Sequence, residues 1–346
     1  KFIKYKMCRK NYIEDFFNGL TKIPEFDQLK ARKAKELQNE LLKPKGSLGK
    51  LEEYAIWMAG WQKKINPSIE NAHCLIFAGN HGVARKGVSA FPSEVTEQMV
   101  ENFKKGGAAI NQLCELAGLK LNVLPLDLDE PTKDFSENFA MDKEEVISAM
   151  QTGFDSVPSN CDLLVLGEMG ISNTTSASAL SCALFNEKVE NMTGTGTGLN
   201  HKQLENKMSV IKSALKLHGT KFTSTIKILS CFGGREISAI AGSIIAARLK
   251  SIPVLLDGFI CTAAASTLTL YDENFLDHCL ISHLSTEPGH LKILSYLKKD
   301  PILDLNLRLG EGSGAAIASL ILKSAIVTHN GMSTFSDAHV TNKNAS

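Results

Sequence analysis

Short apolar runs alternate with longer stretches of helical length along most of the chain. Six runs rich in aliphatic and β-branched residues predict strands, at 72–79, 120–127, 161–168, 225–232, 251–258 and 279–284. The stretches between and after them predict helices at 93–118 (with a break at Gly106-Gly107), 143–152, 173–185, 201–217, 234–249, 261–271, 288–298 and 312–328. Strands that are apolar on both faces and alternate with helices indicate an α/β fold. We expect a parallel sheet of about six strands with helices on both faces.

The first 62 residues differ from the rest, because they contain helical, charged segments and no predicted strand. The segments are "DQLKARKAKELQNELL" and "LGKLEEYAIWMAGWQ". This region therefore predicts a small helical domain or arm, and the polar tail 330–346 is expected to fray near its end.

Composition narrows the classes of partner. The chain has 346 residues, is 43% hydrophobic and carries a formal net charge of +1, which favours a packed core and gives no electrostatic footprint for nucleic acid or an anionic membrane. No stretch is apolar enough to span a bilayer, and the basic start "KFIKYKMCRK" lacks the apolar segment of a signal peptide. The eight cysteines show no CxxC spacing and predict buried, reduced thiols, so we expect a cytoplasmic protein.

Glycine-bearing and acidic turns follow the predicted strands, and in parallel sheets ligands bind at the carboxyl ends of strands. These turns are 78–82, 167–175, 232–236, 257–259, 285–290 and, ahead of the last helix, 309–314. We expect them to lie on one rim of the sheet.

Two segments, one of these turns and a separate glycine-rich loop, have the character of anion sites. In "GEMGISNTT" (167–175), Gly170 permits close backbone approach, while Asn173, Thr174 and Thr175 suit the first turn of a helix with free N–H groups. An ordinary capped turn is the alternative. "GTGTG" (194–198) can wrap a small ligand or form a flexible loop, and it lacks the spacing of a dinucleotide fingerprint.

Histidines in two turns leave alternatives open. Asn80 and His81 follow a strand, so His81 is either an acid/base group or a hydrogen-bonded structural residue. Glu287, His290 and His283 could together hold zinc, but their spacing is not a recognised ligand set and no metal is predicted.

Glu311 stands between Gly310 and Gly312, just before an apolar helix. A carboxylate there would repel a phosphate. Burial would raise its pKa towards the value that a general base needs, whereas the helix N-terminus would lower it. Glu311 is thus either a base or an acid that stabilises the helix dipole.

Several long blocks occur in an order that resembles one family. They are "LLKPKGSLGKLEEYA" (41–55), "FAGNHGVARKGVSAFPSEVTEQMVENFKKGGAAIN" (77–111), "GEMGISNTTSASAL" (167–180), "GTGTGL" (194–199), "CFGGREISAIAG" (231–242), "LLDGFICTAAA" (255–265), "STEPGH" (285–290) and "LRLGEGSGAA" (307–316). The chain resembles the nicotinate-nucleotide:dimethylbenzimidazole phosphoribosyltransferase family from about residue 40 to 337.

The resemblance implies a homodimer with a Rossmann-like, six-stranded parallel sheet. It divides the chain into a helical small domain at 1–65, completed by residues from about 326 to 346, and a catalytic domain at 66–325. It implies transfer of phosphoribose from nicotinate mononucleotide to 5,6-dimethylbenzimidazole, giving α-ribazole 5′-phosphate and nicotinate, without cofactor or metal. The expected partners are these small molecules, in the lower-ligand branch of cobalamin assembly.

By this likeness Glu311 is the general base. The 5′-phosphate is expected on the turns at 170–175, 196–198 and Ser285, and the flat acceptor against Leu309 and the "VSAF" stretch at 88–91. The substrate-binding residues we predict are Glu168, Gly170, Ser172, Asn173, Thr174, Thr175, Gly196, Gly198, Ser285, Leu309, Gly312, Asn80, His81 and Phe91.

Three positions depart from the family pattern, which more often has Asp at Asn80, Gly at Ser172 and a bulkier or basic residue at Thr195. The departures keep alternatives open: a transferase for another acceptor, such as adenine or a phenol, or a ligand-binding homologue that has lost turnover. A dehydrogenase is disfavoured, since the dinucleotide fingerprint is missing.

Overall fold

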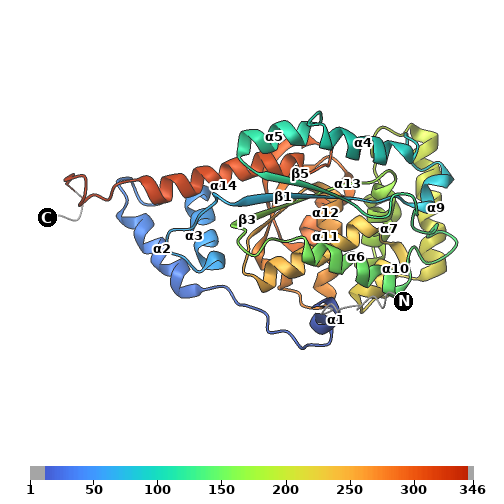
Figure 1. The fold of residues 1–346 in the computed structure, drawn as a ribbon, viewed down its shortest axis with the longest axis horizontal. Helices are drawn as coiled ribbons and strands as arrows, with labels where there is room; N and C mark the ends of the chain where they lie inside the picture. The colour runs from blue at the N-terminus through green and yellow to red at the C-terminus, as the bar shows by residue number, and fades with distance from the viewer. Residues whose placement is uncertain (1–11, 342–346) are drawn as a thin grey trace, which may run out of the picture.

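The computed structural model describes residues 12–341, which form one parallel sheet with helices on both faces (Figure 1). The sheet has six strands in the order β2-β1-β3-β4-β5-β6, and every neighbouring pair is parallel. The strands are β1 Ala72–Ala78, β2 Lys120–Pro125, β3 Leu163–Met169, β4 Val254–Leu256, β5 Cys279–Ser285 and β6 Pro301–Leu307. The order reverses between β1 and β3, which is where open parallel sheets leave a crevice for ligands. The predicted α/β class and sheet are confirmed.

The helices occupy most of the predicted positions. They are α1 Tyr12–Phe17, α2 Gln28–Glu40, α3 Lys50–Gln62, α4 Glu94–Lys104, α5 Ala109–Ala117, α6 Lys143–Asp155, α7 Asn173–Phe185, α8 Val189–Met192, α9 His201–His218, α10 Thr225–Phe232, α11 Arg235–Leu249, α12 Gly258–Ser266, α13 Pro288–Leu297 and α14 Ser313–Gly331. Three 3-10 turns are η1 Gly82–Lys86, η2 Thr267–Leu270 and η3 Phe275–His278.

One strand prediction is wrong and one strand was missed. The segment 225–232 is the helix α10, capped by the side chain of Ser224, with Ile228, Leu229 and Phe232 buried at helical spacing. A short apolar run does not distinguish a buried strand from a buried helix. The sixth strand is instead β6, an edge strand whose residues 304–306 are exposed, so it lacks the apolar character of the central strands.

Side chains of the central strands alternate between two cores. Leu75 and Phe77 of β1 belong to a core shared with α6, α7, α10, α11 and α12, while Cys74 and Ile76 point to a second core shared with α3, α5 and α14. Both faces of β1 are therefore buried, which explains its nearly continuous apolar sequence.

The two chain ends meet at one end of the sheet. In Figure 1, α14 extends beyond the strands to lie beside α2 and α3, and an isolated bridge joins Leu41 to Thr334. Gln38 of α2 hydrogen-bonds to His329 of α14 over 2.8 Å. These contacts fit the proposed small domain made from both ends, whose boundaries at 65 and 326 stay a proposal.

Helix α1 lies apart from α2 and α3. The Tyr12 ring stacks on Phe154 of α6, and Phe16 packs against Tyr271 and Phe275. Of the described helices, none has the length and apolar character that a membrane span requires. Within residues 12–341 the seven cysteines are free and buried, whereas Cys8 and the basic start of the chain lie outside the described residues.

Candidate active site

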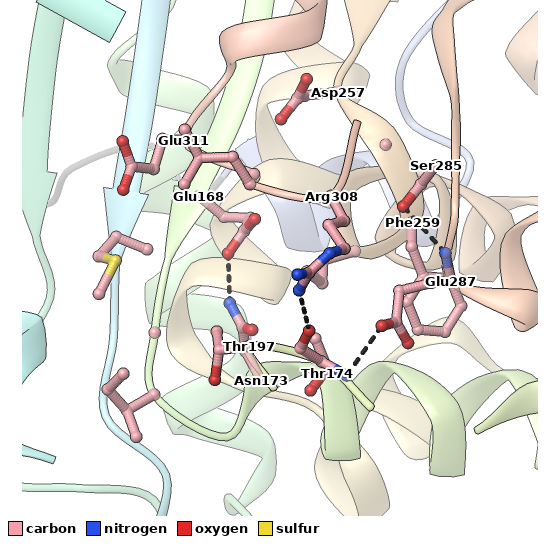
Figure 2. A pocket seen from close by; sticks show the side chains of 18 of the residues that line it. Glu168, Asn173, Thr174, Thr197, Asp257, Phe259, Ser285, Glu287, Arg308 and Glu311 are labelled. Atoms are coloured by element: carbon pink, nitrogen blue, oxygen red, sulfur yellow. Dashed lines mark hydrogen bonds between the residues drawn. The ribbon is translucent and has the colours of Figure 1, made fainter. Parts of the chain in front are cut away.

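A pocket opens at the carboxyl ends of β3, β4, β5 and β6. Eight predicted residues line it: Glu168, Gly170, Asn173, Thr174, Gly196, Ser285, Leu309 and Glu311. The sequence reasoning did not name other lining residues as substrate contacts, among them Met169, Ile171, Thr197, Asp257, Phe259 and Arg308. In Figure 2, Glu311 and Glu168 lie on one side of the pocket, Ser285 and Glu287 lie on the other, and Arg308 lies between them.

Glu311 sits on a turn of three consecutive left-handed residues. The φ angles are 81° at Gly310, 62° at Glu311 and 79° at Gly312. A non-glycine residue in this region is strained, and such strain persists where the surroundings fix it. A Cβ on Gly310 would lie 2.5 Å from the Glu168 carboxylate, so the flanking glycine is required by close approach as well as by φ.

Neighbouring backbone and side-chain groups hold this turn. The Glu311 N–H donates to the Glu168 carbonyl oxygen at 3.2 Å, and the Gly312 N–H donates to the Asp257 carboxylate at 3.0 Å. The turn therefore joins β3 and the end of β4 to the start of α14. Glu311 is 7% exposed and faces the pocket.

Two carboxyl groups of the pocket have raised pKa values. Burial, with a smaller contribution from the Asp257 charge, raises the pKa of Glu311 to about 7. Burial raises the pKa of Glu168 to about 8; the hydrogen bond from Asn173 acts against it, and the charges of Asp257, Glu236 and Glu311 add to it. A carboxyl group that titrates near neutral pH is suited to general base catalysis.

The opposite side of the pocket consists of hydrogen-bonded turns. The Glu287 carboxylate accepts the Gly196 N–H at 2.9 Å, and the Ser285 hydroxyl accepts the Glu287 N–H at 3.3 Å. The His290 ring accepts the Ser285 N–H at 2.9 Å. Glu287 thus ties the glycine loop at 194–198 to the turn after β5 (Figure 2).

Two cations lie beside this loop. Lys207 of α9 is buried, and its ammonium donates to the Thr174 hydroxyl at 3.0 Å and the Gly194 carbonyl at 3.1 Å. Burial lowers the pKa of Lys207 to about 8, while the charge of Glu287 opposes the shift. Arg308 donates to the Gly196 carbonyl at 3.2 Å. Sequence reasoning missed Lys207, because it stands in a charged helix of ordinary surface pattern; Arg308 was visible within the block at 307–316.

The alternative zinc ligands have other partners. The His290 ring contacts the Thr262 hydroxyl at 3.0 Å and accepts the Ser285 N–H, and His283 lies 3.4 Å from Asp257. Within the described part of the chain, no group of three His, Cys, Asp or Glu side chains could hold a metal ion. The geometry gives no support to a zinc site here.

Seven predicted substrate contacts do not line this pocket: Ser172, Thr175, Gly198, Gly312, Asn80, His81 and Phe91. The His81 ring is buried and contacts Glu236 at 2.6 Å, which favours the structural alternative for this histidine. Asn80 donates to the Leu128 carbonyl at 3.0 Å, and Phe91 is 49% exposed. Their contact with substrate stays a prediction.

Comparisons with known proteins agree with this arrangement. A family model described as phosphoribosyltransferase matches residues 23–340. The chain is 48% identical to the nicotinate-nucleotide–dimethylbenzimidazole phosphoribosyltransferase of Ruegeria sp. (strain TM1040), covering 95% of this chain and 97% of that protein. It is 51% identical to the enzyme of that name from Ruegeria pomeroyi, covering 89% and 91%.

The fold matches a solved structure as well. The crystal structure of the nicotinate-nucleotide–dimethylbenzimidazole phosphoribosyltransferase from Thermus thermophilus superposes with a TM-score of 0.84 at 34% identity, covering 91% of this chain and 99% of that one. The chain therefore belongs to the nicotinate-nucleotide:dimethylbenzimidazole phosphoribosyltransferase family.

Proposed function

We infer that the protein transfers phosphoribose from nicotinate mononucleotide to 5,6-dimethylbenzimidazole, releasing nicotinate and forming α-ribazole 5′-phosphate for cobalamin assembly. The assignment of this reaction rests on the family relationship. The observation that supports a catalytic role for Glu311 is its position in the pocket wall, with a carboxyl pKa raised to about 7.

We propose that Glu311 acts as the general base. One nitrogen of the azole attacks C1′ of the ribose, and positive charge grows on the ring as the new C–N bond forms. The Glu311 carboxylate takes the proton from the other nitrogen and relieves that charge. The bond from C1′ to the pyridinium breaks, its electron pair moves to the pyridine nitrogen, and neutral departure of that ring needs no acid or metal. Attack opposite the leaving group inverts β to α.

The phosphate of the mononucleotide is proposed to bind at the side of the pocket away from Glu311. Gly196 and Ser285 lie there with the cation Arg308, and Lys207 lies behind Thr174. The positive charges of Arg308 and Lys207 favour a dianion on this side. We propose that the apolar acceptor binds against the opposite wall, where Met169, Ile171 and Leu309 line the pocket.

The homodimer also belongs to this proposal. Exposed apolar side chains such as Leu116 on α5 (69% exposed) and Val327 on α14 (61% exposed) are available for such an interface. Light scattering behind a sizing column would give twice the chain mass of 37.6 kDa for a dimer. The cytoplasmic location stays a prediction.

Product analysis tests the reaction. The purified protein is mixed with nicotinate mononucleotide and, in separate tubes, 5,6-dimethylbenzimidazole, benzimidazole, adenine or phenol, and products are separated and identified by mass spectrometry. We expect released nicotinate and a riboside phosphate, formed fastest with 5,6-dimethylbenzimidazole. Faster reaction with adenine or phenol would reassign the acceptor, and mononucleotide binding without product from any acceptor would indicate a binding homologue.

A further inference from the structure

Asp257 connects the end of one strand to the start of the helix that follows Glu311. It comes directly after β4, is 2% exposed, and its two carboxylate oxygens accept N–H groups from two points of α14. One oxygen accepts the Gly312 N–H at 3.0 Å, and the other accepts the Ala315 N–H at 3.1 Å. These donors belong to the turn and the first turn of α14.

A helix N-terminus presents free N–H groups and the positive end of the helix dipole. The N-cap residue of α14 is Gly312, which has no side chain, and no side chain caps the helix from within its own segment. Asp257, although it belongs to another element, therefore accepts the free N–H groups of α14 as an N-cap side chain would. Its charge lies where the helix dipole would otherwise stabilise a carboxylate.

Glu311 is the carboxylate that stands next to this helix end. No described residue hydrogen-bonds to its side chain, whereas Asp257 receives the helix N–H groups. We propose that Asp257 is a positioning residue for the transfer: by capping α14 it fixes the Glu311 turn and leaves the Glu311 carboxylate free to take a proton. This proposal rests on the proposed function, since it takes Glu311 as the base.

The groups around Asp257 and Glu311 include some that raise and some that lower their pKa values. Burial raises the pKa of Asp257, while the nearby His283 ring and the backbone N–H groups of Ala315, Gly312 and Gly314 oppose that rise and favour the charged form. The other ionisable groups that face Asp257 or Glu311 are Glu168 from β3, Cys74 from β1 and Cys261 from α12. The Asp257 charge in turn contributes to the raised pKa of Glu311.

Substitutions of Asp257 can separate the effect of its charge from the effect of its hydrogen bonds to α14. Asp257→Asn and Asp257→Ser both keep an oxygen that can accept a helix N–H but remove the charge, while Asp257→Glu keeps the charge. The measurement is kcat/KM for 5,6-dimethylbenzimidazole from pH 5 to 9 in all variants. Titration of the substrates is common to every profile, so a difference between profiles belongs to the enzyme.

We expect the acid limb of the profile to move down by about one pH unit in both neutral variants, since the anion whose charge helps to raise the pKa of Glu311 is lost. Above pH 8 the neutral variants should be slower than the wild type, since a weaker base accepts the proton less readily. The Asp257→Glu variant should lose rate without moving the limb. Thermal melts identify any variant that does not fold.

If the Asp257→Asn or Asp257→Ser variant folds and the acid limb of its kcat/KM profile lies at the same pH as in the wild type, the proposal is overturned. If neither neutral variant folds, Asp257→Glu decides: a limb that moves down despite the retained charge would overturn it. Failure of Glu311 as base has a different signature, because the Glu311→Gln variant would then keep both the rate and the acid limb.

Discussion

The backbone N–H of Glu311 donates to the carbonyl oxygen of Glu168 at 3.2 Å, so two acids from distant parts of the chain lie in one pocket wall. Both carboxyl groups have pKa values raised mainly by burial, to about 7 for Glu311 and about 8 for Glu168. Each carboxyl group therefore titrates close to neutral pH. The neutral pH range is therefore where the site changes charge.

Replacing Glu311 with Gln should slow the reaction without weakening mononucleotide binding. The amide keeps the shape of the side chain but cannot take a proton, so we expect kcat to fall by about 100-fold or more. Turnover is measured with saturating substrates, and binding of nicotinate mononucleotide by calorimetry. Glu205→Gln, an exposed change on α9, serves as control. An unchanged kcat would remove Glu311 from the mechanism.

The pH dependence should show one acid limb near neutrality. A base works only when ionised, and the pKa of Glu311 is raised to about 7, so kcat/KM, after correction for titration of the two substrates, should be constant above about pH 8 and fall about tenfold per unit well below pH 7. Profiles of the wild type and Glu311→Gln are compared. A wild-type limb centred near the ordinary glutamate pKa of 4.5 would contradict the burial effect.

Glu168 should make the folded protein less stable as the pH rises. Its folded pKa of about 8 lies above the ordinary value of 4.5, so between these pH values the unfolded chain releases a proton that the folded chain retains. Stability is therefore lost as pH rises through this range. We expect the melting temperature of Glu168→Gln, relative to the wild type, to be higher at pH 8 than at pH 5; an equal difference at both would refute the raised pKa.

Arg308 should contribute to the binding of nicotinate mononucleotide and not to the binding of 5,6-dimethylbenzimidazole. Arg308→Met removes a charge that lies between the two sides of the pocket, and loss of a charged contact predicts a rise of about 10- to 100-fold in KM for nicotinate mononucleotide. The KM for 5,6-dimethylbenzimidazole should change little. Lys202→Met on the exposed face of α9 removes the same charge elsewhere. Equal effects of the two variants would show that only net charge matters.

Ser172→Gly should stabilise the protein. Ser172 has φ 78° and a buried hydroxyl without a hydrogen-bond partner among the described residues, so this position suits the glycine that the family pattern suggests. Relief of the left-handed strain, partly offset by the flexibility of glycine when unfolded, predicts a gain of about 1 kcal/mol in the free energy of unfolding. Urea denaturation measures it. Ser209→Gly within α9 should instead destabilise.

The sequence alone determined the fold class and most elements. Central strands such as β1 are apolar on both faces and therefore recognisable, and the helix α7 has the predicted bounds, 173–185. The strand predicted at 225–232 was wrong because a mostly apolar run of eight residues fits either structure, and the edge strand β6 was missed because its residues 304–306 are exposed to solvent.

Residues of the candidate site could be predicted only where their neighbours in the sequence mark them. Glu311 between two glycines is unusual in any sequence, and the family blocks around it made its role an expectation. Lys207, Glu287 and Asp257 depend on contacts between distant segments: a lysine in a charged helix has no local mark that it will be buried against Thr174. Likewise, only the tertiary structure decided which carboxylate receives the N–H groups of α14. The sequence left open whether Glu311 stabilises the helix dipole, but packing of β4 against that helix gives the N–H groups to Asp257, and this leaves the Glu311 side chain free.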